Sequence, residues 1–274
     1  MSHSQRRTLI DGSLILVRQA DLLDIARSSL YYVPRVNERD QKIMNTIDEI
    51  YTEYPFYGSR KITWVLRTNY HHQINRKKVQ RLMRLMGLEA IYPRRKPNTS
   101  LSHPQHRKYP YLLQNLAIIR PNQVWGTDIT YIKLETGWAY LVAFIDWFSR
   151  YVISWELSHT LEIAFCLTAR DRALQVATPE ISNSDQGSHF TSEQFLSPLL
   201  HNNVRISMDG RGRCMDNIFT ERLWRTVKYE NVYLKSYRTI AEANAGLTDY
   251  FQFYNTERPH QSLEYQTPES VYRH

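Results

Sequence analysis

The order of expected secondary structure from residue 123 onward constrains the fold most strongly. Three stretches rich in β-branched and aromatic residues are typical of an antiparallel meander; they cover residues 124–133, 138–147 and 150–157. Helical and strand patterns then alternate over residues 161–176, 181–184, 192–201 and 204–207, and a longer helical pattern contains Glu221. Strands and helices in this order predict a mixed α/β layer arrangement, in which helices cover the faces of a sheet.

The first 90 residues have a different pattern, in which apolar residues recur at helical spacing. Residues 17–32 are consistent with two short helices about a tight turn, as in a helix-turn-helix. Further helices are expected over residues 38–52, around 64–66 and over 75–87. Asn75 is expected to cap the last of these, and Gly87 to end it. The front of the chain is therefore expected to be helical throughout.

Charge is distributed unevenly along the chain. Residues 1–120 contain 21 Lys and Arg against 9 Asp and Glu, whereas residues 121–274 contain 14 against 18. A basic front part on a slightly acidic back part is typical of a nucleic-acid-binding arm joined to a metal-dependent core, although a solvated basic surface is the simpler alternative. The 75–87 helix carries Lys77, Lys78 and Arg81 without acidic residues beside them, so we expect it to contact DNA.

Three carboxylates stand at positions where such a core could bring them together. Asp128 lies within the first strand pattern, Asp185 directly follows the 181–184 strand, and Glu221 lies in the long helical pattern. Each residue taken alone has an ordinary explanation as an edge, turn or surface residue. Together they predict a divalent-metal site, because carboxylate oxygens are the ligands that Mg²⁺ prefers.

The helix that contains Glu221 combines an acidic and a basic function. At about 100° per residue, Glu221, Arg225 and Lys228 share one face, while apolar residues turn toward the core. Cleavage of a phosphodiester needs an activated oxygen nucleophile and neutralised charge at phosphorus, which two Mg²⁺ ions supply. The two basic side chains would bind the flanking phosphates.

Several motifs together resemble those of one family. They are Trp125–Tyr131, Ser184–Ser188, Ser207–Gly212, Asp216–Trp224 and Tyr254–Leu263. In these motifs the chain resembles the second-reading-frame (OrfB-type) transposases of two-frame bacterial insertion sequences, which are DDE transposases with a retroviral-integrase-like core. The resemblance covers nearly the whole chain and includes the gap of 35 residues between Asp185 and Glu221. It implies a ribonuclease H-like mixed-sheet catalytic core preceded by small all-helical, helix-turn-helix-like domains.

The resemblance also assigns roles to residues. The family's catalytic and metal-binding acids fall on Asp128, Asp185 and Glu221, and the basic residue that contacts the element end falls on Lys228. The resemblance implies two Mg²⁺ ions, which Mn²⁺ can replace, and a transposase that cleaves DNA and transfers the strand at insertion-sequence ends. The implied partners are DNA (element ends and target) and a first-reading-frame helix-turn-helix protein or fusion, and the protein is expected to act as a homo-oligomer on DNA.

We expect the chain to be organised in five parts. These are an N-terminal helix-turn-helix-like segment (1–36), a helical DNA-binding domain (37–95), a basic Pro-rich linker (96–120), the catalytic core (121–230), and a C-terminal helix and tail packed on the core (231–274). Arg60 and Lys61 fall in the DNA-binding domain and, with Arg225, are expected to contact DNA.

Other function classes have less support in the sequence. No stretch is apolar enough to span a membrane and no signal peptide is evident, so we expect a cytoplasmic protein. The resemblance implies that it is bacterial and nucleoid-associated. The two cysteines, Cys166 and Cys214, have no partner at metal-binding spacing. Two alternatives to the transposase stay open: a catalytically silent DNA-binding regulator of transposition, and a ribonuclease H-type nuclease that cleaves without joining.

Overall fold

The computed structural model describes residues 6, 9–13, 15–26, 38–91, 109–209 and 217–274. The chain divides into two compact units, Met1–Glu49 and Ile50–His274. The boundary falls inside one helix, so the five predicted parts, with their different limits, stay predictions. Within the described ranges, no helix combines the length and the apolar character needed to cross a membrane.

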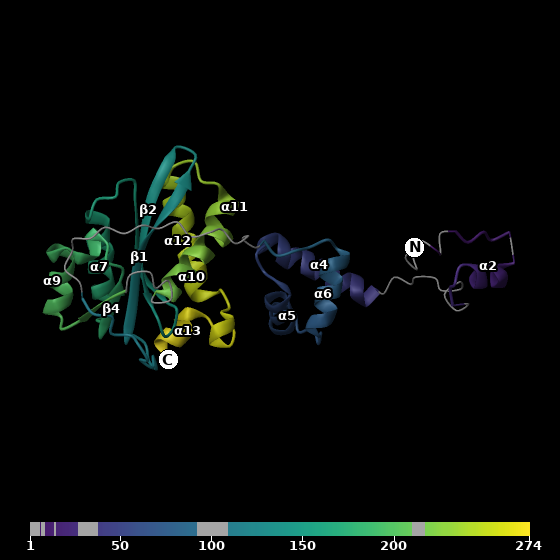
Figure 1. The fold of residues 1–274 in the computed structure, drawn as a ribbon, viewed down its shortest axis with the longest axis horizontal. Helices are drawn as coiled ribbons and strands as arrows, with labels where there is room; N and C mark the ends of the chain where they lie inside the picture. The colour runs from purple at the N-terminus through teal and green to yellow at the C-terminus, as the bar shows by residue number, and fades with distance from the viewer. Residues whose placement is uncertain (1–5, 7–8, 14, 27–37, 92–108, 210–216) are drawn as a thin grey trace. The chain divides into compact units, whose positions relative to one another are not determined.

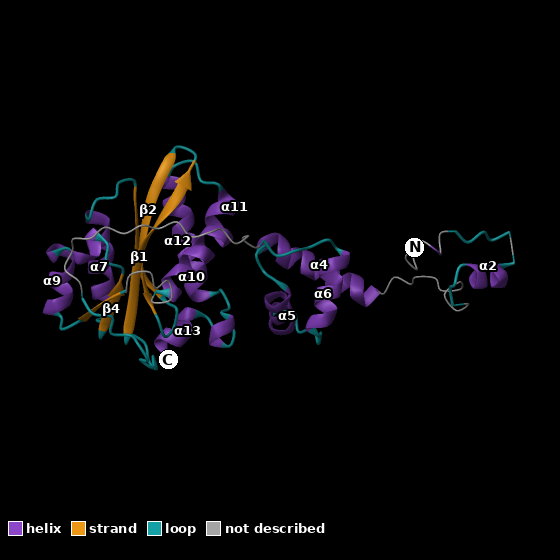
Figure 2. Ribbon diagram, in the orientation of Figure 1, coloured by secondary structure: helices purple, strands orange, loops and turns teal. Residues whose placement is uncertain are grey.

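A mixed five-stranded sheet forms the centre of the second unit (Figures 1 and 2). Its strands are β1 (Val124–Leu134), β2 (Gly137–Asp146), β3 (Val152–Ser158), β4 (Ile181–Ser184) and β5 (Arg205–Met208), in the order β3-β2-β1-β4-β5. The pairs β1–β2 and β2–β3 are antiparallel, which confirms the predicted meander. The pairs β1–β4 and β4–β5 are parallel, so β1 is the strand at which the sheet changes from antiparallel to parallel.

Alternating side chains of β1 feed two separate cores. Val124, Ile132 and Leu134 belong to one buried cluster, and Trp125 belongs to the other. Because neighbouring residues of a strand point to opposite faces, a strand with apolar residues on both faces must be covered on both sides. Helices α7 (Ala164–Val176) and α9 (Glu193–His201) cover one face, and α10 (Ile218–Val227) and α12 (Ile240–Thr256) cover the other (Figure 1). This three-layer arrangement confirms the predicted fold class.

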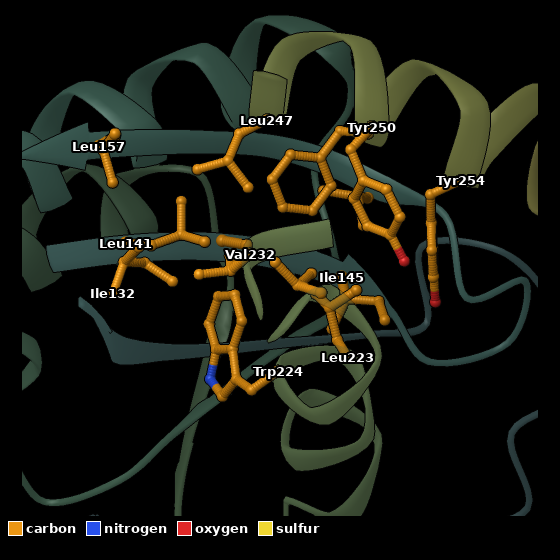
Figure 3. Close-up of a cluster of buried hydrophobic side chains, with 14 of the residues drawn as sticks. Ile132, Leu141, Ile145, Leu157, Leu223, Trp224, Val232, Leu247, Tyr250 and Tyr254 are labelled. Carbon is orange, nitrogen blue, oxygen red and sulfur yellow. The ribbon is translucent and has the colours of Figure 1, made fainter. Parts of the chain in front are cut away.

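The cluster under α10 and α12 is the larger of the two (Figure 3). Leu223 and Trp224 of α10 and Leu247, Tyr250 and Tyr254 of α12 pack on the sheet and are at most 6% exposed. Side chains of this size stabilise the fold by roughly 1.5–3 kcal/mol each when fully buried. Helix α12 therefore helps to hold α10 in place.

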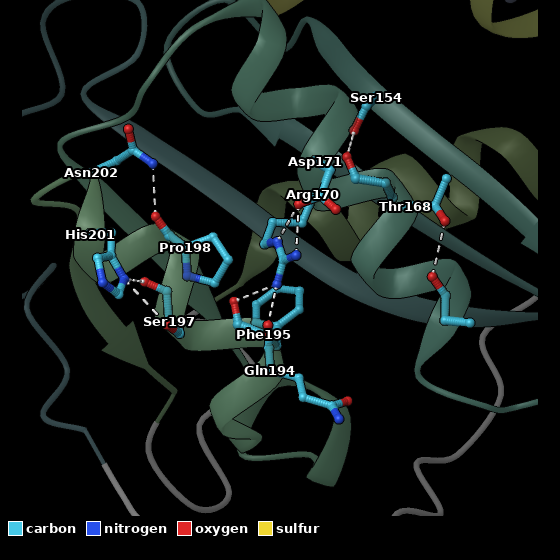
Figure 4. Close-up of polar contacts among 12 residues, drawn as sticks. Ser154, Thr168, Arg170, Asp171, Gln194, Phe195, Ser197, Pro198, His201 and Asn202 are labelled. Carbon is cyan, nitrogen blue, oxygen red and sulfur yellow. Dashed lines mark hydrogen bonds and ion pairs between the residues drawn. The ribbon is translucent and has the colours of Figure 1, made fainter.

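On the opposite face, a buried arginine joins the two covering helices (Figure 4). Arg170 of α7 is 4% exposed, and its guanidinium donates hydrogen bonds to the backbone carbonyls of Gln194 and Phe195 in α9 and to the Asp171 carboxylate. Each donor that is buried here has a polar partner, as a buried charge requires.

The helical patterns of the front part are largely confirmed. Helices α4 (Glu38–Glu53), α5 (Ser59–Thr68) and α6 (Arg76–Leu85) lie where the spacing places them, and α2 (Leu16–Leu22) matches the first half of the N-terminal prediction. The predicted second half, after residue 26, lies outside the described residues. At α6 the Asn75 side chain accepts a hydrogen bond from the Lys77 backbone N–H, and Gly87 has a φ of +70°, so both predicted end signals are confirmed.

Several elements were not predicted. A one-turn helix, α8 (Ser188–Thr191), follows Asp185, and a π-helical turn, η1 (Lys228–Val232), follows α10. The remaining C-terminal elements are α11 (Tyr233–Lys235), the 3₁₀ turn η2 (Gln261–Leu263) and α13 (Pro268–Arg273). Short and π-helical turns escape a periodicity argument because they contain too few residues to show a repeat.

The Tyr254–Leu263 motif holds a buried ion pair. Arg258 donates two hydrogen bonds of 2.6 Å to the Glu230 carboxylate in η1, and Tyr250 donates a third of 3.0 Å. Lys61 of α5 lies 4.0 Å from the same carboxylate. Arg258, the largest favourable influence, holds the pKa of Glu230 below its ordinary value although burial alone would raise it. The motif thus ties the C-terminal segment to the π-helical turn that follows α10.

Replacing Arg258 by leucine is expected to lower the free energy of unfolding by about 3–5 kcal/mol, because it leaves a buried carboxylate with one distant cation. Urea denaturation followed by tryptophan fluorescence measures this change. The matched control is Arg273→Leu, whose ion pair with Glu269 is on the surface and is expected to contribute less than about 1 kcal/mol. Equal losses in the two variants would contradict the stabilising role of the Glu230 pair.

Candidate active site

Asp128 occupies the middle of β1 on the face that α10 covers. It pairs with Ala143 of β2 in the sheet, and its side chain is only partly accessible. The Trp224 indole N–H of α10 donates a hydrogen bond of 3.0 Å to Asp128 Oδ2. One carboxylate oxygen is therefore fixed by the helix, which limits rotation of the side chain.

Gly126 allows α10 to approach β1 this closely. A Cβ atom at Gly126 would lie 2.3 Å from Trp147 Nε1 and 2.7 Å from Thr220 Oγ1, which is too close for any other residue without movement. At the same place the Asn217 side chain donates a hydrogen bond of 3.3 Å to the Thr127 carbonyl and accepts one from Thr220. The first turn of α10 is thus seated directly on the strand that carries Asp128.

Asp185 follows β4, which is the parallel neighbour of β1. Its Oδ1 accepts a hydrogen bond of 2.9 Å from the Gly187 backbone N–H, so the carboxylate is held by the turn that it begins. Asp185 is exposed to solvent, in contrast to Asp128. Because adjacent strands of the sheet carry the two residues, the topology places their carboxylates near one another.

The pKa of Asp128 reflects its burial and the charge of neighbouring carboxylates. Burial is the main cause that raises its pKa to about 7, and the negative charges of Asp185 and Asp209 raise it further. The pKa of Asp185 is also raised, mainly by partial burial, although the Gly187 N–H and His189 oppose this.

Glu221 lies on α10, the helix on which it was predicted, in the first turn. It is exposed, and its pKa is raised by desolvation without a contribution from Asp128 or Asp185. Among the described residues, no three Asp, Glu, His or Cys side chains are close enough to bind one metal ion. The parallel pairing of β1 with β4 places Asp128 and Asp185 on adjacent strands, and the formation of one metal site by all three carboxylates stays a prediction.

The two basic residues of the α10 face have different surroundings. Lys228, at the start of η1, is partly buried; burial lowers its pKa, and the negative charge of Asp128 opposes that shift. Lys228 is thus near Asp128. Arg225 is exposed and lines a cavity of about 570 Å³ together with Arg60 and Lys61.

The other predicted DNA-contacting residues are on the surface, with one exception. On α6, Lys77 and Arg81 are exposed and Lys78 is half-buried. Lys61 instead has a buried ammonium group near Glu230, and burial, followed by repulsion from Arg258, lowers its pKa to about 7. DNA contact by these residues stays a prediction.

Sequence reasoning missed three residues that shape the site, namely Trp224, Asn217 and Asp209. Trp224 and Asn217 hold α10 against β1, and Asp209 lies after β5, where it accepts a hydrogen bond of 2.8 Å from Asn183. One available signal was Gly126, because a glycine inside a strand often marks the close approach of another segment.

Comparison with known proteins gives matches over both units. Residues 38–96 match the family model of an HTH-like domain, and residues 119–214 and 202–268 match two models of an integrase core domain. The transposase for insertion sequence element IS904 of Lactococcus lactis is 35% identical over 77% of this chain and 85% of its own length. The putative transposase InsK for IS150 of Escherichia coli is 30% identical over 89% of each chain.

A solved structure shows the same fold. The chain is similar to a protein in the simian T-cell lymphotropic virus intasome, with 16% identity, a TM-score of 0.50, and coverage of 83% of this chain and 74% of that chain. At this identity the likeness concerns the fold alone. It agrees with the ribonuclease H-like arrangement of the sheet and its covering helices.

Asn at position 128 is expected to remove a pH-dependent loss of stability. The folded protein keeps a proton on Asp128 up to about pH 7, whereas the unfolded chain loses it near pH 4, so the stabilisation present in acid disappears as the pH rises through 7. In EDTA, the free energy of unfolding of wild type should therefore fall by on the order of 1–3 kcal/mol between pH 5 and 8, relative to that of Asp128→Asn. Thermal unfolding at both pH values measures this, with the exposed Asp249→Asn as control. A constant difference between wild type and Asp128→Asn would refute the assignment.

Alanine at position 126 is expected to displace α10 from β1. Overpacking at this contact should cost about 1–3 kcal/mol of unfolding free energy, and the Trp224 hydrogen bond to Asp128 should weaken with it. Gly12→Ala is a suitable control, because nothing lies within 4 Å of a Cβ atom there. Thermal unfolding that is equally unchanged in both variants would contradict the proposed close contact.

Proposed function

The chain belongs to the insertion-sequence transposases that have an integrase-type catalytic core, and from this membership we propose that it cleaves and joins DNA strands at the ends of such an element. The observation that carries the proposal is the pair of neighbouring carboxylates, Asp128 and Asp185, beside α10 and next to Lys228. Carboxylates at this edge of the sheet, with a basic residue beside them, suit chemistry on a phosphodiester.

The donor set fits divalent cations in part. Desolvation raises the pKa values of both Asp128 and Asp185, and the negative charge of Asp185 raises that of Asp128 further. A bound cation would reduce the repulsion between the two carboxylates. We propose that Asp128, Asp185 and Glu221 hold two Mg²⁺ ions, or Mn²⁺ in their place. When bound, these ions would activate the attacking oxygen and stabilise the charge that develops on the leaving oxygen.

The proposed reaction proceeds in two displacements at phosphorus. In the first, a water oxygen forms a new P–O bond while the bond to the 3′-oxygen breaks, and the released 3′-oxygen takes up a proton. In the second, this 3′-OH attacks another phosphodiester: its oxygen forms a P–O bond, the bond from that phosphorus to the leaving strand oxygen breaks, and the leaving oxygen takes up the proton that the 3′-OH releases. Trp224 keeps the Asp128 carboxylate oriented through Oδ2, and Lys228 binds a phosphate beside it.

The helical part of the chain would supply DNA binding. Residues 38–96 match an HTH-like domain, and α6 presents Lys77 and Arg81 to solvent. We propose that the substrate is DNA, both at the element ends and at the target, and that a first-reading-frame protein assists in recognition. Two ends have to be joined in one reaction, so we propose a homo-oligomer on DNA.

A second candidate is a catalytically silent DNA-binding regulator, which would use the HTH-like domain of residues 38–96 without the carboxylates. The two candidates differ in a single respect, namely whether the carboxylates are needed for joining DNA strands.

Strand-transfer assays with labelled element ends and Mg²⁺ test the proposal. Asp128→Asn, Asp185→Asn and Glu221→Gln are each expected to reduce joining by at least about 100-fold, since each removes a ligand that contributes several kcal/mol to the transition state. Asp249→Asn, an exposed acid outside the site, should behave as wild type. DNA affinity in EDTA should be retained in all variants. Equal joining by wild type and Asp185→Asn would exclude the enzyme, and cleavage without joining would indicate a nuclease.

A further inference from the structure

Five arginines line one cavity of about 570 Å³: the buried Arg258, which pairs with Glu230, and four others from three helices. Arg60 lies on α5, Arg76 is the first residue of α6, and Arg222 and Arg225 lie on α10. All four side chains are exposed. The helix that carries Glu221 and two helices of the HTH-like domain thus contribute to the same recess.

These four exposed arginines have no acidic partners. In the described part of the chain, the ion pairs at this cavity are Lys61 with Glu230 and Arg258 with Glu230, and none of the four arginines takes part in an ion pair. Four guanidinium groups around one recess repel each other unless an anion lies between them. The positive charge of the recess is therefore not compensated by the protein, and a bound anion would stabilise it.

The one acid in the lining does not compensate them. Glu230 already accepts two hydrogen bonds from Arg258 and one from Tyr250, and Arg258 lowers its pKa against the effect of burial. Lys61 also lines the recess, but burial lowers its pKa to about 7, so the positive charge here comes from the four exposed arginines. The recess thus carries a large positive excess.

The start of α5 adds backbone donors to the same place. Gly58 and Ser59 line the cavity, and no side chain caps this helix. The first N–H groups of a helix are unpaired within it and favour a nearby anion. This supports the charge argument but does not carry it.

We propose that the recess binds a phosphate of the DNA backbone, which the arginines of the HTH-like helices and those of α10 hold jointly. The inference rests on the proposed function and makes it more specific. Arg binds phosphate through two parallel N–H groups, and arginines on opposite walls can share one phosphate. Because α10 also carries Trp224 and Glu221, a phosphate held here would fix the DNA relative to the carboxylates.

A double-mutant cycle tests the shared phosphate. Binding of duplex element ends is measured by fluorescence anisotropy in EDTA for wild type, Arg76→Gln, Arg222→Gln and the double variant. Each single change is expected to weaken binding about tenfold, and the double variant by clearly less than the product of about 100-fold, because both arginines bind one phosphate. The slope of log affinity against log salt should fall by about 0.9 in all three variants.

The control for charge alone is Arg205→Gln, an exposed arginine at the start of β5 outside the recess. It should weaken binding much less and combine multiplicatively with Arg222→Gln. The four residues are exposed, so unfolding temperatures should match wild type in every variant. The proposal would be overturned if the losses of DNA affinity in Arg76→Gln and Arg222→Gln multiply in the double variant, or if each loss only equals that of Arg205→Gln.

Calorimetric titration with inorganic phosphate and with ATP distinguishes DNA from a small phosphate ligand. Weak millimolar binding supports DNA as the source of the phosphate. Micromolar binding of inorganic phosphate or ATP that Arg222→Gln abolishes, while the DNA affinity of that variant is unchanged, would overturn the proposal that the recess binds a DNA phosphate. If wild type fails to join strands but Arg76→Gln and Arg222→Gln still combine non-multiplicatively in DNA binding, only the proposed function is contradicted. If wild type joins strands but its DNA affinity does not change in the arginine variants, only the phosphate-binding role of the recess is contradicted.

Discussion

The contact between α10 and β1 at Gly126 is the constraint on which the site depends. The absence of a side chain at Gly126 lets Thr220 and Trp147 occupy the space above the strand, and Asn217 bonds to the backbone of Thr127. Trp224 then reaches Asp128. A displacement of the helix would change the orientation of the Asp128 carboxylate and the position of Glu221 together, so packing and chemistry are linked at this glycine.

Charge is distributed in two contrasting ways around α10. On the sheet side, burial and then the negative charge of Asp185 raise the pKa of Asp128 to about 7. On the other side, Glu230 is paired with Arg258, whereas the four exposed arginines of the 570 Å³ recess form no ion pair within the part of the chain that the structure describes. The first region is suited to bind cations and the second to bind an anion. A nucleic-acid enzyme that uses metal ions needs both.

The sequence was sufficient for most of the fold. The meander, the strand that ends at Ser184 and the cap at Asn75 follow from alternation and turn chemistry, which are local properties. The π-helical turn η1 and the role of the Tyr254–Leu263 motif were not accessible. Arg258 and Glu230 are 28 residues apart and meet only because α12 packs on the sheet beside η1.

For the site, the sequence determined which residues are available, and the tertiary structure decided which of them meet. Asp128 within a strand, Asp185 at a strand end and Glu221 on a helix could be identified because each position is set by local pattern. The parallel pairing of β1 with β4 placed the two aspartates on adjacent strands, and the packing of α10 on β1 placed Glu221 on the helix that bonds to Asp128. Lys61 shows the same division: its basic side chain is evident in the sequence, but its burial near Glu230 follows from long-range packing. Distances between segments and the desolvation of charges depend on contacts between residues far apart in the chain, and no local pattern specifies them.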